Sequence, residues 1–108
     1  MIELTEKYVF HIPLSKYVVD ELVLIELDDL LEDLISEFSR NGFDSLYMTK
    51  VKSLYKSRLY DEILITIFTS KEESPFEVFE KWFRGNNDVL GQESFGYEHG
   101  NRMIIFDL

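Results

Sequence analysis

The sequence predicts an α+β fold of the ferredoxin-like type, a split βαβ sandwich with two helices on one face of an antiparallel sheet. Two segments have the spacing of amphipathic helices, and segments of strand length lie before, between and after them. Neither an internal repeat nor a linker interrupts this order. The order strand, helix, strand, strand, helix, strand predicts a sheet of four to five strands, with a C-terminal hairpin as an open alternative. We expect residues 1–108 to form a single α+β domain.

The first strand is predicted at Tyr8–Leu14, where apolar side chains recur at every second position. Its even-numbered residues form one face, and Val9 and His11 lie on the other. Pro13 has no backbone N–H, so it indicates a sheet edge or the end of the strand.

The longest helical pattern follows, between Asp20 and Arg40. Its start is ambiguous, because Asp29 and Glu32 have the spacing of a capping box, and the helix proper can begin near Asp28. The segment Val18–Glu26 is then extended or loop. The end is predicted at Asn41, within two residues, from a terminal arginine followed by Asn-Gly. The apolar stripe of this pattern includes Leu24, Leu27, Leu31, Leu34 and Phe38.

Acidic residues are concentrated on the polar side of this pattern. Eight acids and no lysine or arginine lie between Asp20 and Glu37, and without them the formal net charge of -10 would be -2. A local acidic face favours a protein partner with a basic surface. A solvated helix face and a cation site are the alternatives, although the spacing of known calcium and di-iron motifs is absent. The predicted partner-binding residues are Glu26, Asp28, Asp29, Glu32, Asp33 and Glu37.

Two strands are expected after this helix. The first is Ser45–Tyr55, followed by a polar turn over Lys56–Asp61. The second, Glu62–Thr69, is apolar on both sides, which is typical of a central strand.

The second helix has the clearest start signal in the chain. Ser74 is the predicted N-cap, Pro75 is at the first helical position, and Glu77 completes a capping box. Gly85 is the predicted end. The expected buried stripe consists of Phe76, Phe79, Trp82 and Phe83.

The remaining chain is predicted to contain a loop or short irregular turn over Asn86–Gln92. Ser94–Leu108 is then a strand, or a hairpin that turns at His99-Gly100-Asn101.

The sheet of such a sandwich has a second face that no helix covers. Alternation places Tyr47, Thr49 and Val51 on a common face of their strand, and His11 projects from another strand. We interpret these four residues as a dimerisation or ligand face, if theirs is the uncovered face, because exposed apolar and aromatic surface is often covered by a partner. A homodimer and a monomer remain equally open.

Composition excludes several classes of protein. The absence of cysteine excludes disulfides and thiolate chemistry and fits a cytoplasmic location. No apolar run is long enough to span a membrane, and no secretion signal is recognised. A pI near 4.5 argues against nucleic-acid binding. With two histidines and no glycine-rich phosphate loop, we assign no catalytic residue, metal or cofactor.

These observations lead to two functional hypotheses. The first is a non-catalytic protein-protein interaction module of the inhibitor, immunity or phosphate-mimic type, acting through the acidic helix face or the open sheet face. The alternative is a small dimeric α+β barrel enzyme or small-molecule-binding protein, with a pocket between sheet and helices and with His11 and Tyr47 as the residues to test.

Overall fold

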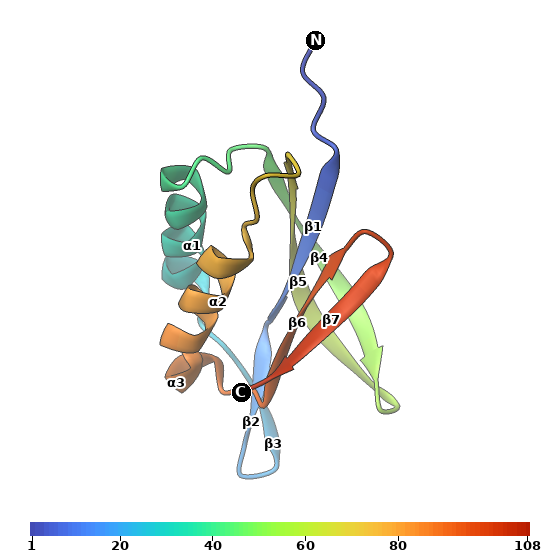
Figure 1. The fold of residues 1–108 in the computed structure, drawn as a ribbon. Helices are drawn as coiled ribbons and strands as arrows, with labels where there is room; N and C mark the ends of the chain where they lie inside the picture. Colours follow the sequence, from blue (N-terminus) through green and yellow to red (C-terminus); the bar gives the residue numbers. More distant parts are fainter.

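A computed structural model describes residues 1–108 and confirms the predicted α+β class. Five strands form an antiparallel sheet in the order β4-β5-β1-β6-β7, and β2 pairs with β3 in a separate hairpin. The helices lie on one face of the large sheet (Figure 1), an arrangement compatible with a ferredoxin-like sandwich. The elements are β1 (Glu6–Pro13), β2 (Ser15–Val18), β3 (Glu21–Leu24), α1 (Asp28–Arg40), β4 (Leu46–Tyr55), β5 (Arg58–Thr69), α2 (Phe76–Gly85), α3 (Asn87–Leu90), β6 (Ser94–His99) and β7 (Arg102–Asp107).

The middle strand, β1, carries the centre of the hydrophobic core. The predicted alternation is confirmed, because Tyr8, Phe10 and Ile12 are buried on the face toward the helices. The ring of Phe10 lies 5.7 Å from that of Phe38 in α1 and 4.5 Å from that of Phe79 in α2. The side chain of Phe10 therefore packs against both helices from the sheet.

The segment before α1 is not helical, so the longer of the two possible helices does not form. Residues from Ser15 to Leu24 form the β2–β3 hairpin, so the start near Asp28 is confirmed and a helix from Asp20 is wrong. The reason lies in the backbone: the N–H of Ile25 donates to the carbonyl of Leu14 at 2.9 Å, which ties this segment to the end of β1. The hairpin turn has left-handed φ values at Val19 (48°) and Asp20 (66°).

The C-terminal end of α1 is predicted correctly from sequence, whereas its N-terminal cap is not. The capping box is wrong, because Leu27 occupies the N-cap position and no side chain caps it. The C-terminal prediction is confirmed: the helix ends at Arg40, and the N–H of Asn41 donates to the carbonyls of Glu37 and Phe38. Gly42 then adopts a left-handed φ of 88°.

The hairpin of β4 and β5 is longer than expected. Only Lys56 and Ser57 form its turn, and the ladder continues through Tyr55 opposite Arg58, so the polar turn over Lys56–Asp61 is wrong. The alternating charged and apolar residues of this segment occupy the two faces of an exposed hairpin arm. Glu62–Thr69 does lie in the sheet interior, between β4 and β1.

The C-terminal third follows its prediction closely. α2 begins at Phe76, one residue later than predicted, with Pro75 in place of Ser74 at the N-cap; the N–H of Phe76 donates to Ser74 Oγ at 3.3 Å, and the helix ends at Gly85. Glu77 makes no return bond, so the capping box is incomplete. The Asn86–Gln92 segment contains the one-turn helix α3, and the predicted hairpin turns at Gly100 and Asn101. None of the helices is long and apolar enough to cross a membrane.

Candidate functional site

The uncovered face of the large sheet carries a hydrogen-bonded group of polar side chains. Antiparallel register places Thr49 of β4, Leu64 of β5 and His11 of β1 in one row across this face. Glu98 of β6 lies opposite Val9 and therefore projects from the same side. The open face thus brings together residues that are far apart in the sequence.

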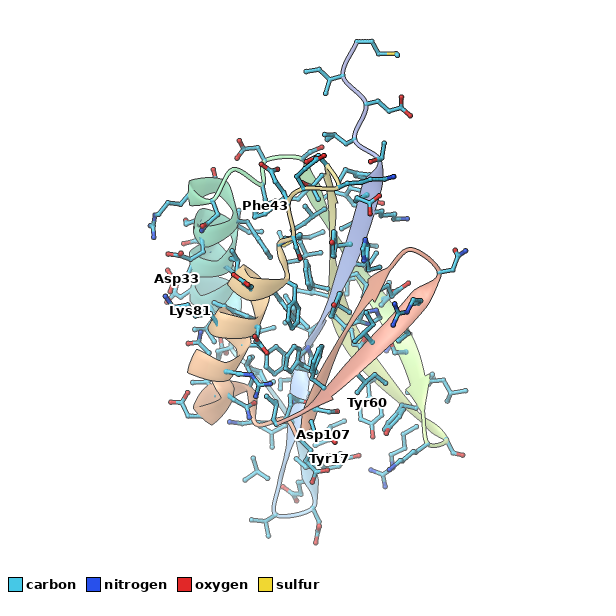
Figure 2. The ribbon with its side chains drawn as sticks, viewed as in Figure 1. Tyr17, Asp33, Phe43, Tyr60, Lys81 and Asp107 are labelled. Carbon is cyan, nitrogen blue, oxygen red and sulfur yellow. The ribbon has the colours of Figure 1, made fainter.

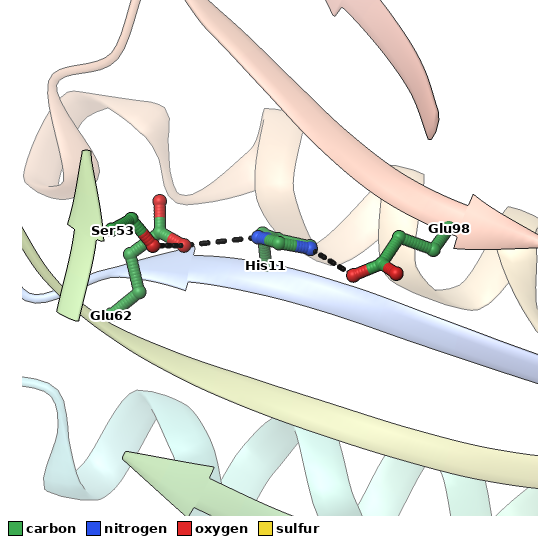
Figure 3. Close-up of polar contacts among 4 residues, drawn as sticks. All are labelled: His11, Ser53, Glu62 and Glu98. Carbon is green, nitrogen blue, oxygen red and sulfur yellow. Dashed lines mark hydrogen bonds and ion pairs between the residues drawn. The ribbon is translucent and has the colours of Figure 1, made fainter. Parts of the chain in front are cut away.

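His11 lies between two carboxylates from neighbouring strands (Figure 3). Its Nδ1 is 2.9 Å from Glu62 Oε2, and its Nε2 is 2.7 Å from Glu98 Oε2. Ser53 extends the line of contacts, because its Oγ donates to the same oxygen of Glu62 at 2.8 Å. We call His11, Ser53, Glu62 and Glu98 the sheet cluster.

Burial and charge oppose each other at His11. Partial burial is the largest single influence and lowers the pKa of the imidazole, but the hydrogen bonds and charges of Glu62 and Glu98 together outweigh it and raise the pKa above its ordinary value. At Glu62 burial raises the pKa, and the bonds from His11 and Ser53 reverse this, so that it lies below its ordinary value. Both shifts favour an imidazolium between carboxylates.

The cluster remains open to solvent. The side chains of His11 and Glu62 are 21% and 23% exposed, and that of Glu98 is 43% exposed. Glu98 is therefore the carboxylate that a molecule arriving from solution meets first. A site with one partly buried cation and two carboxylates can bind positively charged ligand groups or move a proton.

The four predicted face residues lie on this same side of the sheet. Val51 is opposite Glu62 in the register, while Thr49 and Tyr47 follow along β4. Only His11 belongs to the hydrogen-bonded cluster, and Tyr47 lies on β4, with β5 between its strand and that of His11. The assignment of Tyr47, Thr49 and Val51 to dimerisation or ligand binding stays a prediction.

Apolar side chains surround the cluster on the open face. Tyr47 and Tyr55 of β4 are each about half exposed, as are Met103 and Ile105 of β7. Gly96 of β6 lies beneath β7, where an added Cβ would come within 2.6 Å of Met103 Cε. The polar cluster is thus flanked at both edges by surface able to pack against an apolar or aromatic group.

The predicted acidic face lies elsewhere in the molecule. Asp28, Asp29, Glu32, Asp33 and Glu37 belong to α1, and Glu26 lies just before it. All are exposed except Glu37, which is half-buried and forms an ion pair with Arg40. In Figure 2, Asp33 points outward from the helix layer. Binding of a basic partner here stays a prediction.

The alternative hypothesis placed a pocket between the sheet and the helices, and two open grooves lie there, the smaller of which is lined by the charged residues Glu26, Asp28, Lys50 and Asp61. The space between α1 and β4 contains an open groove of about 630 Å³ and an adjoining groove of about 250 Å³, which share Asp28 and Leu31. Aromatic side chains fill the interior beside them. A hydrogen-bonded group of polar side chains lies on the opposite face of the sheet.

A second polar contact joins the two hairpins at one end of the molecule. Tyr17 of β2 and Tyr60 of β5 lie near each other in Figure 2, with their hydroxyls 3.1 Å apart. Arg58 donates to the hydroxyl of Tyr17 at 2.7 Å. This contact holds the small hairpin beside the β4–β5 arm.

Sequence analysis missed Ser53, Glu62 and Glu98 as site residues. Glu62 was interpreted as the start of an apolar strand, and Glu98 as part of a hairpin arm. A charged residue at the entrance to an otherwise apolar strand is the available signal for Glu62. No sequence signal places it beside His11, because the strand order and register decide that neighbourhood.

Two solved structures are similar to this chain over its whole length. One is a phage SAM lyase in complex with S-methyl-5′-thioadenosine, which is 14% identical, with a TM-score of 0.60 over 100% of this chain and 95% of that chain. The other is a phage SAM lyase in its apo state, 18% identical, with a TM-score of 0.59 over the same shares. Likeness at this identity shows the fold. No family model and no curated protein matches the sequence.

These neighbours correct the first functional hypothesis. A non-catalytic interaction module acting through an acidic helix or open sheet face is wrong as the leading interpretation, because the fold matched over the full chain is that of a lyase. The alternative, a small α+β enzyme or small-molecule-binding protein, is better supported. The location of its site, between sheet and helices, stays a prediction.

Proposed function

We propose that the protein is a small enzyme that cleaves S-adenosylmethionine on the open face of its sheet. The observation that carries this proposal is the sheet cluster, in which His11 joins Glu62 and Glu98 at 2.9 and 2.7 Å on that face. The fold shared with a phage SAM lyase supplies the substrate class. Because the neighbours are less than 20% identical, the chemistry is argued from the residues of this chain.

The substrate has features that the open face can match. S-adenosylmethionine carries an ammonium group, a sulfonium group and an aromatic base. Glu98, with its partly exposed carboxylate, can accept hydrogen bonds from the ammonium group. The half-exposed rings of Tyr47 and Tyr55 offer surfaces for stacking and for cation-π contact.

The charge that is lost when the C–S bond breaks decides which part of the open face should bind the sulfonium group and which should bind the ammonium group. When the C–S bond breaks, its electron pair stays on sulfur, and the carbon accepts an electron pair from an oxygen of the substrate's own carboxylate, which closes a lactone. The sulfonium charge is thereby lost in a neutral thioether. A carboxylate beside the sulfonium would therefore stabilise the substrate more than the transition state. The ammonium keeps its charge throughout, so the acidic cluster is the better place for it. The aromatic residues of β4 are then left to stack on the adenine base, since a cation-π contact with the sulfonium would also be lost in the transition state.

A second copy of the chain covering the open face would complete this site. Met103 and Ile105 on β7 and Tyr47 and Tyr55 on β4 expose apolar surface on both sides of the cluster. A homodimer that pairs these faces would exclude water and form the dimeric barrel expected for the enzyme. The mass of the protein in solution tests this point: a dimer that Ile105→Glu converts to monomer supports it, and a wild-type monomer contradicts it.

Incubation with S-adenosylmethionine, followed by chromatographic separation of S-methyl-5′-thioadenosine, tests the enzyme proposal. We expect turnover by the wild type and a loss of roughly tenfold or more in kcat/KM for Glu98→Gln, since a charge-assisted bond contributes about 1.5–3 kcal/mol. Glu32→Gln on α1 is the matched control and should keep full activity.

Two outcomes would overturn this proposal. Binding without turnover would assign the protein to the ligand-binding alternative. Absence of both binding and turnover would remove S-adenosylmethionine as its substrate class.

A further inference from the structure

The hydrogen bonding of His11 constrains its protonation state. Both ring nitrogens lie within hydrogen-bond distance of carboxylate oxygens, Nδ1 with Glu62 and Nε2 with Glu98. An ionised carboxylate only accepts hydrogen bonds, and a neutral imidazole has a single N–H to donate. Both contacts can be satisfied together only when His11 is an imidazolium. The proton on this ring therefore holds the carboxylates together across β1.

Other cationic side chains do not supply this charge. On the strands beside His11, β5 contributes Glu62 and β6 contributes Glu98, while Ser53 of β4 bonds to Glu62. Arg58 and Tyr60 of β5 share the open face with Glu62, but both contact the hydroxyl of Tyr17, at 2.7 and 3.1 Å. Lys52 of β4 pairs with Asp61 at 3.0 Å, and the register places both on the opposite face. Across β6, Met103 of β7 faces Glu98.

On its own strand, His11 shares the open face with Val9 and with Lys7. Lys7 lies four residues away, or about 13 Å along an extended strand. Loss of the His11 proton would therefore leave two carboxylates without a nearby cation.

We infer that Glu62 and Glu98 form a binding site for the ammonium group of a ligand, and that this group competes with the proton on His11. The inference rests on the proposed function and deepens it, because it names the ligand group and the control of its binding. When the ammonium enters, one proton leaves the imidazole for solvent, so the charge of the site is conserved. A neutral His11 then donates to one carboxylate, and the ligand donates to the other.

The electrostatics of the cluster agree with such an exchange. The carboxylates raise the pKa of His11 although burial opposes it, so the site favours a cation at this position. A ligand ammonium offers the same charge and several N–H donors. A ligand without a cationic group has nothing to exchange for the proton, and its affinity should be independent of the protonation of His11.

Calorimetric titration with two ligands tests this competition. S-adenosylhomocysteine carries the ammonium and, as a neutral thioether, lacks the sulfonium leaving group, whereas S-methyl-5′-thioadenosine lacks the ammonium. From about pH 5.5 to about pH 8, across the ordinary range of histidine titration, we expect Kd for S-adenosylhomocysteine to fall roughly tenfold. Kd for S-methyl-5′-thioadenosine should stay constant. Titrations in buffers of different ionisation enthalpy should show proton release with the first ligand alone.

Two histidine variants separate this effect from a general effect of pH. His11→Gln keeps one donor but cannot carry the proton, so its affinity for S-adenosylhomocysteine should no longer vary with pH. His99→Gln is the matched control, because His99 also contacts a glutamate, Glu6, at 3.2 Å. It should keep the wild-type pH dependence. Wild-type affinity that is the same at both pH values would overturn the inference, as would unchanged pH dependence in His11→Gln.

A direct measurement keeps the inference testable if S-adenosyl ligands do not bind or if His11→Gln does not fold. Methylammonium chloride is added to the wild-type protein while the His11 ring is titrated by NMR. A lowered pKa of His11 in its presence supports the competition even if the proposed substrate is wrong, and an unchanged pKa overturns it. Turnover of S-adenosylmethionine together with an unchanged His11 pKa would leave the proposed function standing and remove this inference.

Discussion

The two faces of β1 show how one strand separates stability from chemistry. Phe10 points toward the helices and contacts the rings of Phe38 and Phe79. His11, the next residue, points to the open face and contacts two carboxylates. Successive side chains of a strand alternate between faces, so a dry aromatic core and a partly solvated charged cluster occupy the same backbone.

The two histidines extend this comparison across the sheet. His99 of β6 lies on the helix side, where its ring stacks on that of Tyr8 with centroids 4.0 Å apart and its Nε2 pairs with one carboxylate, that of Glu6. His11 has a carboxylate at each ring nitrogen and no stacked aromatic partner. Pairing with a glutamate is therefore common to both, and it is the second carboxylate that distinguishes the candidate site.

The largest expected effect comes from the helix face. Phe10→Ala leaves a cavity beneath both helices and should lower the free energy of unfolding by about 3–5 kcal/mol. Tyr47→Ala on the open face removes a half-exposed ring and should cost less than about 1 kcal/mol. Urea unfolding measures both. Equal losses would mean that the open face is as tightly packed as the core, for example against a second copy.

The pH dependence of stability should come from the open face. His11 has a pKa above its ordinary 6.5 in the folded protein. Its contribution to the free energy of unfolding is therefore fully present below pH 6.5 and is lost as pH rises through the pKa of the folded protein. Glu62 has a pKa below its ordinary 4.5, so its contribution is present above that pH and is lost as pH falls through the folded value. Together His11 and Glu62 stabilise the folded protein most between about pH 4.5 and 6.5.

Unfolding free energies at about pH 5.5 and about pH 8 test this expectation against the ordinary histidine range. The decrease on raising pH should be smaller in His11→Gln than in the wild type, whereas His99→Gln should retain the wild-type decrease. An identical pH dependence in all three proteins would show that His11 is not linked to folding.

A smaller effect is expected at the rim of the cluster. Ser53→Ala removes the hydroxyl that donates to Glu62 at 2.8 Å and should reduce stability by about 1 kcal/mol, because both groups are partly exposed. Thr49→Ala, on the same strand and face, is the control and should change stability by less than about 0.5 kcal/mol. Equal losses in the two variants would mean that the hydroxyl does not support Glu62.

The smallest effect is expected on the acidic helix. Glu37→Gln breaks the exposed ion pair with Arg40 in α1 and should reduce the unfolding free energy by no more than about 0.5 kcal/mol. It should leave catalytic activity unchanged, since α1 covers the face opposite the cluster. A loss of activity comparable to that of Glu98→Gln would indicate that the acidic face contributes to the activity.

Local sequence patterns determined most of the elements. Aromatic residues at helical spacing and Gly85 predicted α2, and strict alternation predicted the two faces of β1 and β4. These features depend on neighbours within a few residues, which the sequence displays directly. The stretch before Asp28 was ambiguous for the same reason, because its leucines fit a helical period, whereas in the structure Leu22 and Leu24 pair with Tyr17 and Ser15 of β2.

The candidate site was decided by tertiary structure. His11 and Val51 were placed on their strand faces by alternation, but Glu62 and Glu98 are separated from His11 by 51 and 87 positions in the chain. They meet because β5 and β6 pair on either side of β1 in one particular register. A shift of one residue would send either carboxylate to the core face, and that choice is made by packing of the whole sheet against its helices.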